Sequence, residues 1–503
     1  MEQKKEGKVW LVGAGPSDAE LLTLKAKRVL EQAEVVVYDR LVGESILLMM
    51  PEAAEKIDAG KRSGNHTMPQ EQMNELLLKK AQEGKCVVRL KGGDPFLFGR
   101  GGEELELLAK HNIPFEVVPG VTSAISVPAY NGIPVTHRDY ASSVHIITGH
   151  KKKDEPLNLD FTTLAKLEGT LVFLMGVSAL TDICQGLCNG GKAKETPAAL
   201  LSRGTTAKQR RIVSTLEKLP EEVKKNPMET PAVIVVGEVC GLSDEFNWYE
   251  KLTLFGKKII VTRPRERSRA LAERLRSLGA EVLELPSIRT VALDEQTELW
   301  QAFDRMDTYQ WIAFTSPTGA EIFFEELKNA HKDIRSLAGV HIAAIGQGTA
   351  KVLEERGILV DLIPEIYDGD SLGEALAAKL TGGEKVLLPR AGKGNENLVK
   401  ILKTHGARVD DIATYDTVYE KSRLINIGEE IRTGSIDCVV FTSASTVKGF
   451  VESTGLADYS GVVAACIGKQ TKAAADAYGM QTYVAEKATI EDLIDLVVKI
   501  KNK

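Results

Sequence analysis

The stretch that decides the fold is Val87–Gly101, VVRLKGGDPFLFGRG, in which an apolar run meets a glycine-rich turn. Val87–Leu90 predicts a strand, Gly92–Asp94 a sharp turn and Glu103–Leu108 a helix. Glycines let the backbone approach a ligand closely, and an acid at a strand end can bind ribose hydroxyls or a cation. The pattern predicts a ligand-binding loop at the carboxyl end of a sheet strand, and a tight turn with accidental charges is the alternative.

Composition narrows the class of protein. The chain of 503 residues is too long for one hydrophobic core, so we expect several domains. Six scattered cysteines without a CxxC pair argue against a disulfide framework and against a zinc site. No apolar run is long enough to span a bilayer, and the first residues lack the core of a signal peptide. We therefore expect a cytoplasmic protein without a membrane partner.

Charge indicates the kind of ligand. A net charge of −6 gives no footprint for nucleic acid, so none is expected as a partner. Cations nevertheless gather locally, which is consistent with a small polyanionic ligand, and solvated faces are the alternative. The clusters are Lys61–Arg62, Arg89 with Lys91 and Arg100, Arg203 with Arg210–Arg211, and Arg263–Arg269.

Strand-like runs alternate with amphipathic stretches nearly throughout, which predicts an α/β fold with parallel sheets. A change near Thr136–Ala141 divides the first half into sub-domains of about 1–137 and 138–245, and a segment without a regular period predicts a linker at 246–256. The expected strands are Lys8–Val12, Glu34–Tyr38, Cys86–Leu90, Phe115–Val118, Val144–Thr148, Thr170–Met175 and Ala232–Val236, and the expected helices are Ala19–Ala33, Met68–Glu83 and Glu103–His111.

The remainder, 257–503, contains an internal repeat. WIAFTSPTGAEIFF from Trp311 matches CVVFTSASTVKGFV from Cys438, and IIVTRP from Ile259 matches VLLPRA from Val386. A constant offset predicts a duplicated α/β unit, with a cleft between two similar lobes. The landmarks that lie 127 residues apart are Arg263 and Arg390, Gly279 and Gly406, and Phe314 and Phe441.

A second glycine turn lies in VWLVGAGPSD, Val9–Asp18. A dinucleotide fingerprint is the weaker interpretation, because the third glycine is missing and Pro16 occupies the turn. The same loop, followed by LLTLKA, YDRLV and GGDPF, resembles the tetrapyrrole methylases. GKRSGNHTMPQEQMN, EVVPGVTSAISVPAYNGIPVTHR, TLVFLMG, RGTTAKQR and PAVIVVGEV make it similar to the uroporphyrinogen-III C-methyltransferase branch over nearly all of 8–239.

This resemblance implies a homodimeric enzyme that uses S-adenosyl-L-methionine, releases S-adenosyl-L-homocysteine and needs no metal. It implies Asp39 as proton acceptor and Lys61 as proton donor; a cap and a surface charge are the respective alternatives. Ser17 stands where the family usually has glycine in GPGD, which we expect to tighten the loop slightly. The implied cofactor-binding residues are Pro16, Gly92, Gly93, Asp94, Leu97, Thr122, Ser123, Met175 and Gly204, with a core position for Met175 and a helix cap for Thr122–Ser123 as alternatives.

The implied tetrapyrrole substrate carries many carboxylates, so cations should surround the site. The candidates are Arg62, Arg100, Arg138, Arg203 and Arg210. No spacing supports His66 and His137 as metal ligands, so no metal is expected.

Residues from about 257 onward resemble uroporphyrinogen-III synthase in IVTRP, FTSPTGAEIFF, AAIGQGTAKVL, YDGDSL, LLPRA, TYDTVY, VVFTSAST and CIGKQTKAA. This family closes linear hydroxymethylbilane into a ring while inverting ring D. The resemblance implies an outer lobe of about 257–288 with 418–503 and a middle lobe of about 289–417.

Because much of the reactivity belongs to this substrate, residues that bind and fold it are expected rather than a nucleophilic triad. Tyr415 is the implied donor to the leaving hydroxyl, with a packed strand aromatic as the alternative. The candidate substrate-binding residues are Arg263, Thr315, Ser316, Thr349, Arg390, Thr442, Ser443 and Thr471; for the arginines solvent exposure is the alternative, and for Thr349 and Thr471 a helix cap.

Together the two resemblances imply a bifunctional enzyme of tetrapyrrole biosynthesis. The C-terminal half would make uroporphyrinogen III, and the N-terminal half would methylate it at C2 and C7 to precorrin-2, on the route to sirohaem or cobalamin. The alternatives are a methylase for another corrin position, a methylase with a C-terminal regulatory module that lacks synthase activity, and an unrelated oxidoreductase.

Overall fold

The computed structural model describes residues 7–60, 68–150, 157–262, 265–285, 287–392, 394, 396–419 and 424–501. The chain divides into two compact units. Unit 1 comprises Met1–Pro286 with Ser422–Lys503 and holds three five-stranded sheets, whereas unit 2 comprises Ser287–Lys421 and holds one. The middle lobe implied by the sequence, about 289–417, lies inside the bounds of unit 2.

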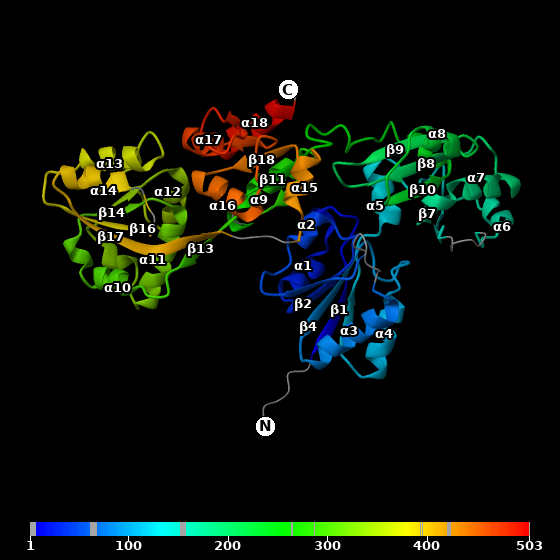
Figure 1. Cartoon of the computed structure of the whole chain (residues 1–503), viewed down its shortest axis with the longest axis horizontal. Helices are drawn as coiled ribbons and strands as arrows, with labels where there is room; N and C mark the ends of the chain where they lie inside the picture. The colour runs from blue at the N-terminus through cyan, green and yellow to red at the C-terminus, as the bar shows by residue number, and fades with distance from the viewer. Residues whose placement is uncertain are drawn as a thin grey trace. The chain divides into compact units, whose positions relative to one another are not determined.

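The first sheet of unit 1 is parallel, in the order β3-β2-β4-β1-β5. Its central strands are apolar on both faces, because Val36 and Val88 pack into one hydrophobic core and Val35 and Val87 into another. The strands are β1 (Lys8–Gly13), β2 (Val35–Tyr38), β3 (Glu55–Asp58), β4 (Cys86–Lys91) and β5 (Phe115–Val118), and the helices are α1 (Leu24–Glu31), α2 (Glu44–Leu47), α3 (Gln70–Gln82) and α4 (Gly101–Lys110) (Figure 1).

The helix expected at Ala19–Ala33 is wrong in its first part. A 3-10 turn, η1 (Ala19–Leu21), precedes α1, and Leu22 between them is extended. The side chain of Thr23 accepts the backbone N–H of Ala26 and begins a new helix. Capping chemistry therefore overrides the apolar periodicity.

The second sheet of unit 1 is mixed, in the order β6-β7-β10-β8-β9. β6 and β7 are parallel, whereas β10 is antiparallel to β7 and β8, and β9 is antiparallel to β8. The expected parallel arrangement is wrong here, because the short segment Arg203–Gln209 between β8 and β9 cannot make a crossover. The elements are β6 (Val144–Thr148), β7 (Thr170–Leu174), β8 (Pro197–Ser202), β9 (Arg210–Thr215), β10 (Ala232–Val236), α5 (Ser123–Tyr130), α6 (Phe161–Ala165), α7 (Leu180–Asn189) and α8 (Leu219–Lys225).

The third sheet of unit 1 is parallel throughout, in the order β12-β11-β18-β19-β20. Its strands come from both ends of the C-terminal half, so a chain that leaves and returns completes it. The elements are β11 (Lys258–Val261), β12 (Glu281–Glu284), β18 (Cys438–Phe441), β19 (Val463–Cys466), β20 (Gln481–Val484), α9 (Arg265–Ser277), α15 (Ile427–Arg432), α16 (Ala444–Thr454), α17 (Lys469–Asp476) and α18 (Ile490–Lys501).

Unit 2 repeats this sheet. Its order is β13-β17-β16-β14-β15, and every ladder is parallel except that between β13 and β17. Without the edge strands β13 and β20, the order β17-β16-β14-β15 corresponds to β12-β11-β18-β19, which confirms the predicted duplication. The elements are β13 (Ile288–Ala292), β14 (Trp311–Phe314), β15 (His341–Ala344), β16 (Lys385–Ala391), β17 (Arg408–Tyr419), α10 (Thr297–Asp304), α11 (Pro317–Asn329), α12 (Gln347–Glu354), α13 (Gly369–Ala377) and α14 (Glu396–Thr404).

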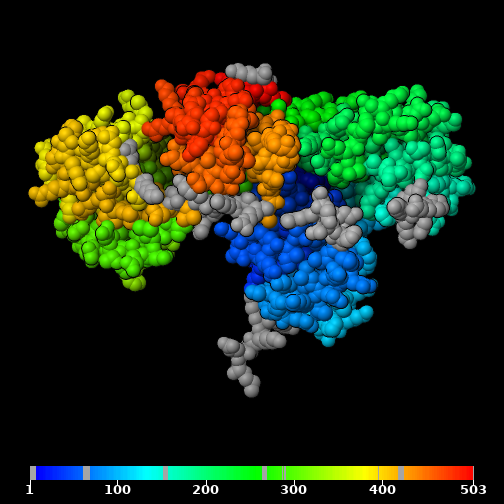
Figure 2. Space-filling view, viewed as in Figure 1, coloured from blue at the N-terminus to red at the C-terminus, as the bar shows by residue number. Residues whose placement is uncertain are grey.

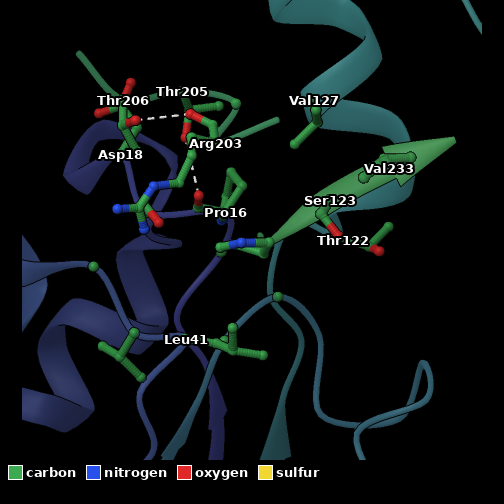
Figure 3. A pocket seen from close by; sticks show the side chains of 18 of the residues that line it. Pro16, Asp18, Leu41, Thr122, Ser123, Val127, Arg203, Thr205, Thr206 and Val233 are labelled. Atoms are coloured by element: carbon green, nitrogen blue, oxygen red, sulfur yellow. Dashed lines mark hydrogen bonds between the residues drawn. The ribbon is translucent and has the colours of Figure 1, made fainter. Parts of the chain in front are cut away.

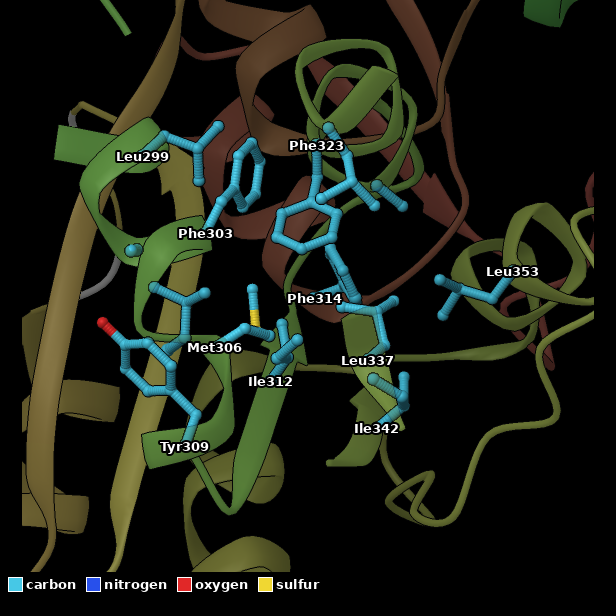
Figure 4. Close-up of a cluster of buried hydrophobic side chains, with 14 of the residues drawn as sticks. Leu299, Phe303, Met306, Tyr309, Ile312, Phe314, Phe323, Leu337, Ile342 and Leu353 are labelled. Carbon is cyan, nitrogen blue, oxygen red and sulfur yellow. The ribbon is translucent and has the colours of Figure 1, made fainter. Parts of the chain in front are cut away.

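Aromatic side chains fill the main core of unit 2. The ring of Phe323 lies edge-on to the rings of Phe303 and Phe314, with centroids 5.1 and 5.2 Å apart (Figure 4). The space-filling view shows one outer face of this unit, whose described residues run from green through yellow towards orange (Figure 2). Unit 2 therefore has a hydrophobic core of its own.

The predicted linker is a packed segment. Tyr249 is buried, and its ring contacts those of Tyr130 and Phe255. The indole N–H of Trp248 donates to the carbonyl oxygen of Ala129, at 3.0 Å. The absence of a regular period reflects an irregular but ordered backbone, held by aromatic contacts to α5.

Candidate functional site

Two glycine loops meet at the carboxyl end of the first sheet. Gly15 follows β1 and Gly93 follows β4, and their backbones exchange two hydrogen bonds, at 3.1 and 2.8 Å. Gly120, after β5, packs against both loops, because a β-carbon there would lie 2.2 Å from the carbonyl oxygen of Gly93 and 2.7 Å from Cα of Gly13. The Val87–Gly101 stretch thus forms the expected loop at a strand end, and only glycine fits where the three loops touch.

These loops border a cavity of about 1310 Å³ within unit 1. Pro16, Thr122 and Ser123 lie on its wall, together with residues of the Arg203–Thr206 turn (Figure 3). The structure brings together all nine predicted cofactor-binding residues there: Pro16, Gly92, Gly93, Asp94, Leu97, Thr122, Ser123, Met175 and Gly204. Their cofactor role stays a prediction, but their convergence from distant parts of the sequence is a structural fact.

Uncommon backbone conformations gather on the same wall. Among the described residues, eight other than glycine have a positive φ, and six of them line this cavity. Such conformations cost free energy and cluster at functional sites. The six residues are Ser17, Phe98, Arg100, Met175, Arg203 and Thr205.

Two of these residues answer questions that the sequence left open. Met175 is 49% exposed, so the alternative of a core position is wrong. Ser17 has a φ of 117°, in the range that favours glycine, which explains why a glycine suits this position. Thr122 caps α5, because its hydroxyl accepts the N–H of Ala124 at 3.3 Å, and it also lines the cavity, so the cap does not replace the predicted cofactor role.

Asp94 organises the loop. Its Oδ1 accepts the backbone N–H groups of Phe96 and Leu97 at 2.8 and 3.1 Å, and its Oδ2 accepts that of Gly120 at 3.1 Å. The carboxylate therefore ties the loop after β4 to the loop after β5 and fixes the shape of the cavity wall.

The turn between β8 and β9 closes another side of the cavity. The hydroxyl of Thr205 donates to the carbonyl oxygen of Pro16, at 3.0 Å, so this turn is tied to the loop after β1 (Figure 3). Tyr130 donates its hydroxyl to Asp18 at 2.9 Å, and burial together with the Asp18 charge raises the pKa of Tyr130. The phenol therefore remains a neutral donor.

Buried charges lie at the ends of β2 and β4. Arg89 and Lys91 are each 5% exposed, and both donate to Oε1 of Glu104, which is 1% exposed, at 3.2 and 2.8 Å. Nη2 of Arg89 lies 3.6 Å from Oδ2 of Asp39, whose Oδ1 accepts the N–H of Leu41. Solvated faces are therefore the wrong interpretation of Arg89 and Lys91, and Asp39 both caps its turn and faces the cavity.

The remaining predicted arginines differ in position. Arg100 lines the cavity and makes a bidentate pair with Glu103, at 2.9 and 2.6 Å. Arg203 also lines it, with Nε 3.2 Å from Glu229. Arg138 and Arg210 are exposed and are not among its lining residues, so the structure does not bring them to the site. Lys61, Arg62, His66 and Arg263 lie outside the described residues.

A further part of the cavity wall was not predicted from the sequence, and its residues come after β10 in the chain. Trp248, Tyr249 and Leu252 line the cavity, as do Lys258 and Glu281 of β11 and β12. Burial alone would lower the pKa of Lys258, but Glu281, Glu44 and Glu430 outweigh it and raise that pKa. The run of aromatics in the presumed linker was the available signal.

The predicted residues of the third sheet lie at helix starts. Ser443 caps α16 and accepts the N–H of Thr446 at 3.3 Å, and Thr442 lies directly before it. Thr471 is the third residue of α17 and is 4% exposed. Gly468 is the N-cap, so a capping role for Thr471 is wrong.

Unit 2 repeats these positions. Ser316, next to Thr315, caps α11, and Thr349 is buried at the third position of α12, after the N-cap Gly346. Its capping role is therefore wrong as well. Tyr415 is 7% exposed, and its hydroxyl shares a hydrogen bond of 2.7 Å with Ser316, so it is a packed strand aromatic with a polar partner.

Arg390 is neither solvent-exposed nor free to approach a ligand unpaired. Its side chain is 5% exposed, and its guanidinium makes two 2.6 Å hydrogen bonds to Asp411 on the neighbouring strand. The predicted contact of Arg390 with substrate would have to be made from within this pair.

No group of three or more His, Cys, Asp or Glu side chains suited to a metal ion occurs among the described residues. None of the helices formed by those residues combines the length and apolar character that a bilayer crossing requires.

Comparisons with known proteins match the two halves of the chain to two different families. A family model described as tetrapyrrole (corrin/porphyrin) methylases matches residues 8–220, and one described as uroporphyrinogen-III synthase HemD matches 269–495. The porphyrin biosynthesis protein HemD of Ruminiclostridium josui is 46% identical over 99% of this chain and 98% of its own length.

Two relatives match the first half alone. The S-adenosyl-L-methionine-dependent uroporphyrinogen III methyltransferase of Methanosarcina barkeri is 56% identical over 47% of this chain and 94% of its own length. The crystal structure of uroporphyrin-III C-methyl transferase from Thermus thermophilus complexed with S-adenyl homocysteine is 43% identical, covers 46% of this chain and 98% of that chain, and has a TM-score of 0.40.

Proposed function

Since this chain belongs to the HemD family of porphyrin-biosynthesis proteins and joins a tetrapyrrole methylase to a uroporphyrinogen-III synthase, we propose that it carries out two consecutive reactions. The C-terminal half closes hydroxymethylbilane to uroporphyrinogen III with inversion of ring D. The N-terminal half then transfers two methyl groups from S-adenosyl-L-methionine to C2 and C7, giving precorrin-2.

The observation that carries the methylase proposal is the convergence of nine predicted residues and Asp39 on one cavity. Its volume of about 1310 Å³ exceeds the ~300–1,000 Å³ of a typical small-molecule pocket, which leaves room for a nucleoside and part of a macrocycle. The close glycine loops offer backbone groups, and exposed Met175 offers an apolar contact.

When bound, S-adenosyl-L-methionine would supply a methyl group activated by its sulfonium. The residues of this chain would hold the methyl donor and accept the proton that the reaction releases. The loops around Gly93 and Gly120 fix the donor, and Asp39 accepts the proton that a pyrrole nitrogen loses once the ring carbon has formed its new bond. Lys61 is proposed as the proton donor by resemblance only.

For the synthase half, the support is the family match and the duplicated sheets. Each sheet presents a serine-capped helix and a buried threonine in equivalent positions. We propose that backbone N–H groups at these helix starts bind substrate carboxylates, and that Tyr415 donates to the leaving hydroxyl.

We also propose that the protein works in the cytoplasm as a homodimer formed through the methylase half. The support is the resemblance of that half to a homodimeric family. Light scattering on the purified full chain, at several concentrations, tests the dimer directly, and a monomer at all concentrations would contradict it.

One experiment tests both activities. The purified full chain is incubated with hydroxymethylbilane, with and without S-adenosyl-L-methionine. Isomer III without the donor, and a dimethylated product with it, are the expected results. Isomer I alone would contradict the synthase proposal and favour a regulatory C-terminal module. Asp39→Ala should abolish methylation and leave ring closure intact, with exposed Glu106→Gln as a control that keeps both.

A further inference from the structure

Four charged side chains that line the cavity form a cluster of Asp39, Arg89, Lys91 and Glu104. When all four are ionised, two cations balance two carboxylates. Three of the four are nearly inaccessible to water, with exposures of 5% for Arg89, 5% for Lys91 and 1% for Glu104. Buried charges persist only when they are paired, so the ionisation of each member depends on the others.

Arg89 cannot change its position easily. It stands on β4, opposite Val37 of β2. Its Nη1 donates to the carbonyl oxygens of Val37 and Leu90 at 3.4 and 3.1 Å, and its Nε donates to Glu104 at 3.2 Å. Only Nη2 remains to face Asp39, 3.6 Å from Oδ2. The guanidinium is therefore a fixed cation beside the carboxylate that follows β2.

Glu104 holds both cations through a single oxygen. Oε1 accepts from Arg89 and Lys91, and the amide of Gln70 lies 3.5 Å away. Oε2 is buried, and no donor among the described residues reaches it. Burial and repulsion from Arg89 lower the pKa of Lys91, while the Glu104 charge opposes this. Glu104 thus compensates a cation pair that would otherwise be unbalanced.

We propose that Glu104, through Arg89 and Lys91, positions Asp39 and sets its readiness to take up a proton during methylation. This inference rests on the proposed function of Asp39. Glu104 is a positioning residue here, since its bonded partners are the two cations rather than Asp39.

The charges that face Asp39 define what each substitution does. From β4, Arg89 lies 3.6 Å from Asp39, and Lys91 interacts with it electrostatically, while Glu104 of α4 acts through these two cations. Arg40, the next residue in the chain, and Glu44, the first residue of α2, line the same cavity, and Asp58, the last residue of β3, pairs in register with Tyr38. Removing the Glu104 charge leaves an excess cation beside Asp39, so Asp39 binds a proton less readily. Removing the Lys91 charge leaves an excess anion and has the opposite effect.

The test compares pH profiles of kcat for methylation in the full chain. For Glu104→Gln we expect the acid limb to move down by about one pH unit and the plateau of kcat to fall about tenfold, with KM for S-adenosylmethionine within about twofold. For Lys91→Met we expect the acid limb to move up. The double variant restores neutrality, and its acid limb should return towards that of the wild type. Glu106→Gln, an exposed glutamate on the same helix, is the matched control.

Opposite shifts of the acid limb in the single variants, and their cancellation in the double variant, distinguish an electrostatic effect from a loss of structure. A purely structural role predicts that both single variants lose activity without opposite shifts and that the double variant is worst, which would overturn the proposal. Unchanged profiles would overturn it as well. If Glu104→Gln fails to fold, Lys91→Met and the double variant still decide the sign. A wild-type chain that does not methylate at all would instead refute the proposed function on which this inference rests.

Discussion

Replacing Ser17 by glycine should stabilise the methylase half. Ser17 has a φ of 117°, and the backbone around it is crowded, since a β-carbon on Gly43 would lie 2.4 Å from the Ser17 carbonyl oxygen. No hydrogen bond from the Ser17 hydroxyl is found among the described residues. A non-glycine residue in so sparsely populated a region costs about 1–3 kcal/mol. Glycine loses roughly 0.5–1 kcal/mol through the greater freedom of the unfolded chain.

The mid-values of these two costs give an expected net gain of about 1 kcal/mol for Ser17→Gly, which corresponds to a rise of roughly 2–4 °C in the Tm of a domain of this size. Differential scanning calorimetry of the full chain measures it, and the transition that responds to S-adenosylmethionine identifies the methylase half.

Two controls define the cause. Ser17→Ala keeps the β-carbon and should leave the Tm nearly unchanged. Ser178→Gly, in the short 3-10 helix η2 (Val177–Ala179), should lower it, because glycine weakens a helical backbone. An unchanged or lower Tm for Ser17→Gly would refute the assignment of strain to this position.

Three further predictions concern other parts of the molecule. Gly120→Ala should lower the stability of the methylase half by about 3 kcal/mol, because the new β-carbon would lie 2.2 Å from a backbone atom. Gly102→Ala should leave the stability unchanged, because its β-carbon would have no atom within 4 Å. Equal Tm values of the two variants in calorimetry would contradict this prediction. Burial raises the pKa of Tyr309 to about 12, above its ordinary value of 10. The stability that the neutral phenol gives unit 2 should therefore be complete below pH 10 and lost as the pH rises through about 12. Urea unfolding at each pH measures this stability, and the same loss in Tyr309→Phe would contradict the prediction. Tyr415→Phe should lower kcat for ring closure about 10- to 100-fold, as expected for a lost hydrogen bond to a developing charge. Ser316→Ala removes a hydrogen-bond partner of Tyr415 and should lower kcat less. A wild-type rate for Tyr415→Phe, measured by product chromatography, would contradict the role of Tyr415.

The central strands of the first sheet were predictable because most of their residues are apolar on both faces, whereas the polar edge strand β3 was not predicted. Phe115–Val118 is a strand with the expected bounds, and Cys86–Leu90 extends by one residue. The antiparallel pairing of β8 and β9 was not predictable from apolar runs, because strand direction depends on the length and geometry of the connecting turn. The break in the helix before Leu24 was also not predicted, because it depends on one hydrogen bond from the backbone N–H of Ala26 to the hydroxyl of Thr23.

The candidate site was predictable where a motif fixes the backbone and less so where charge is buried. The glycine-loop residues that the resemblance implied for cofactor binding line one cavity. Arg89 and Lys91 looked like a surface cluster because their partner, Glu104, follows a turn and belongs to α4, where it resembles any helical glutamate. The position of Trp248 was not predicted because the residue lies in a segment without regular structure, and only tertiary contacts fix the position of such a segment.

The antiparallel ladder between β13 and β17 gives unit 2 the character of an inserted domain. Ile288, just after the entry into this unit, pairs directly with Tyr419, just before the exit, so both ends of a segment of well over a hundred residues lie one strand spacing apart. Such a segment can be excised and replaced by a short turn without stretching the remaining chain, and it can be grafted into another loop of similar width. The duplicated sheet could therefore have been acquired, or lost, as one genetic cassette.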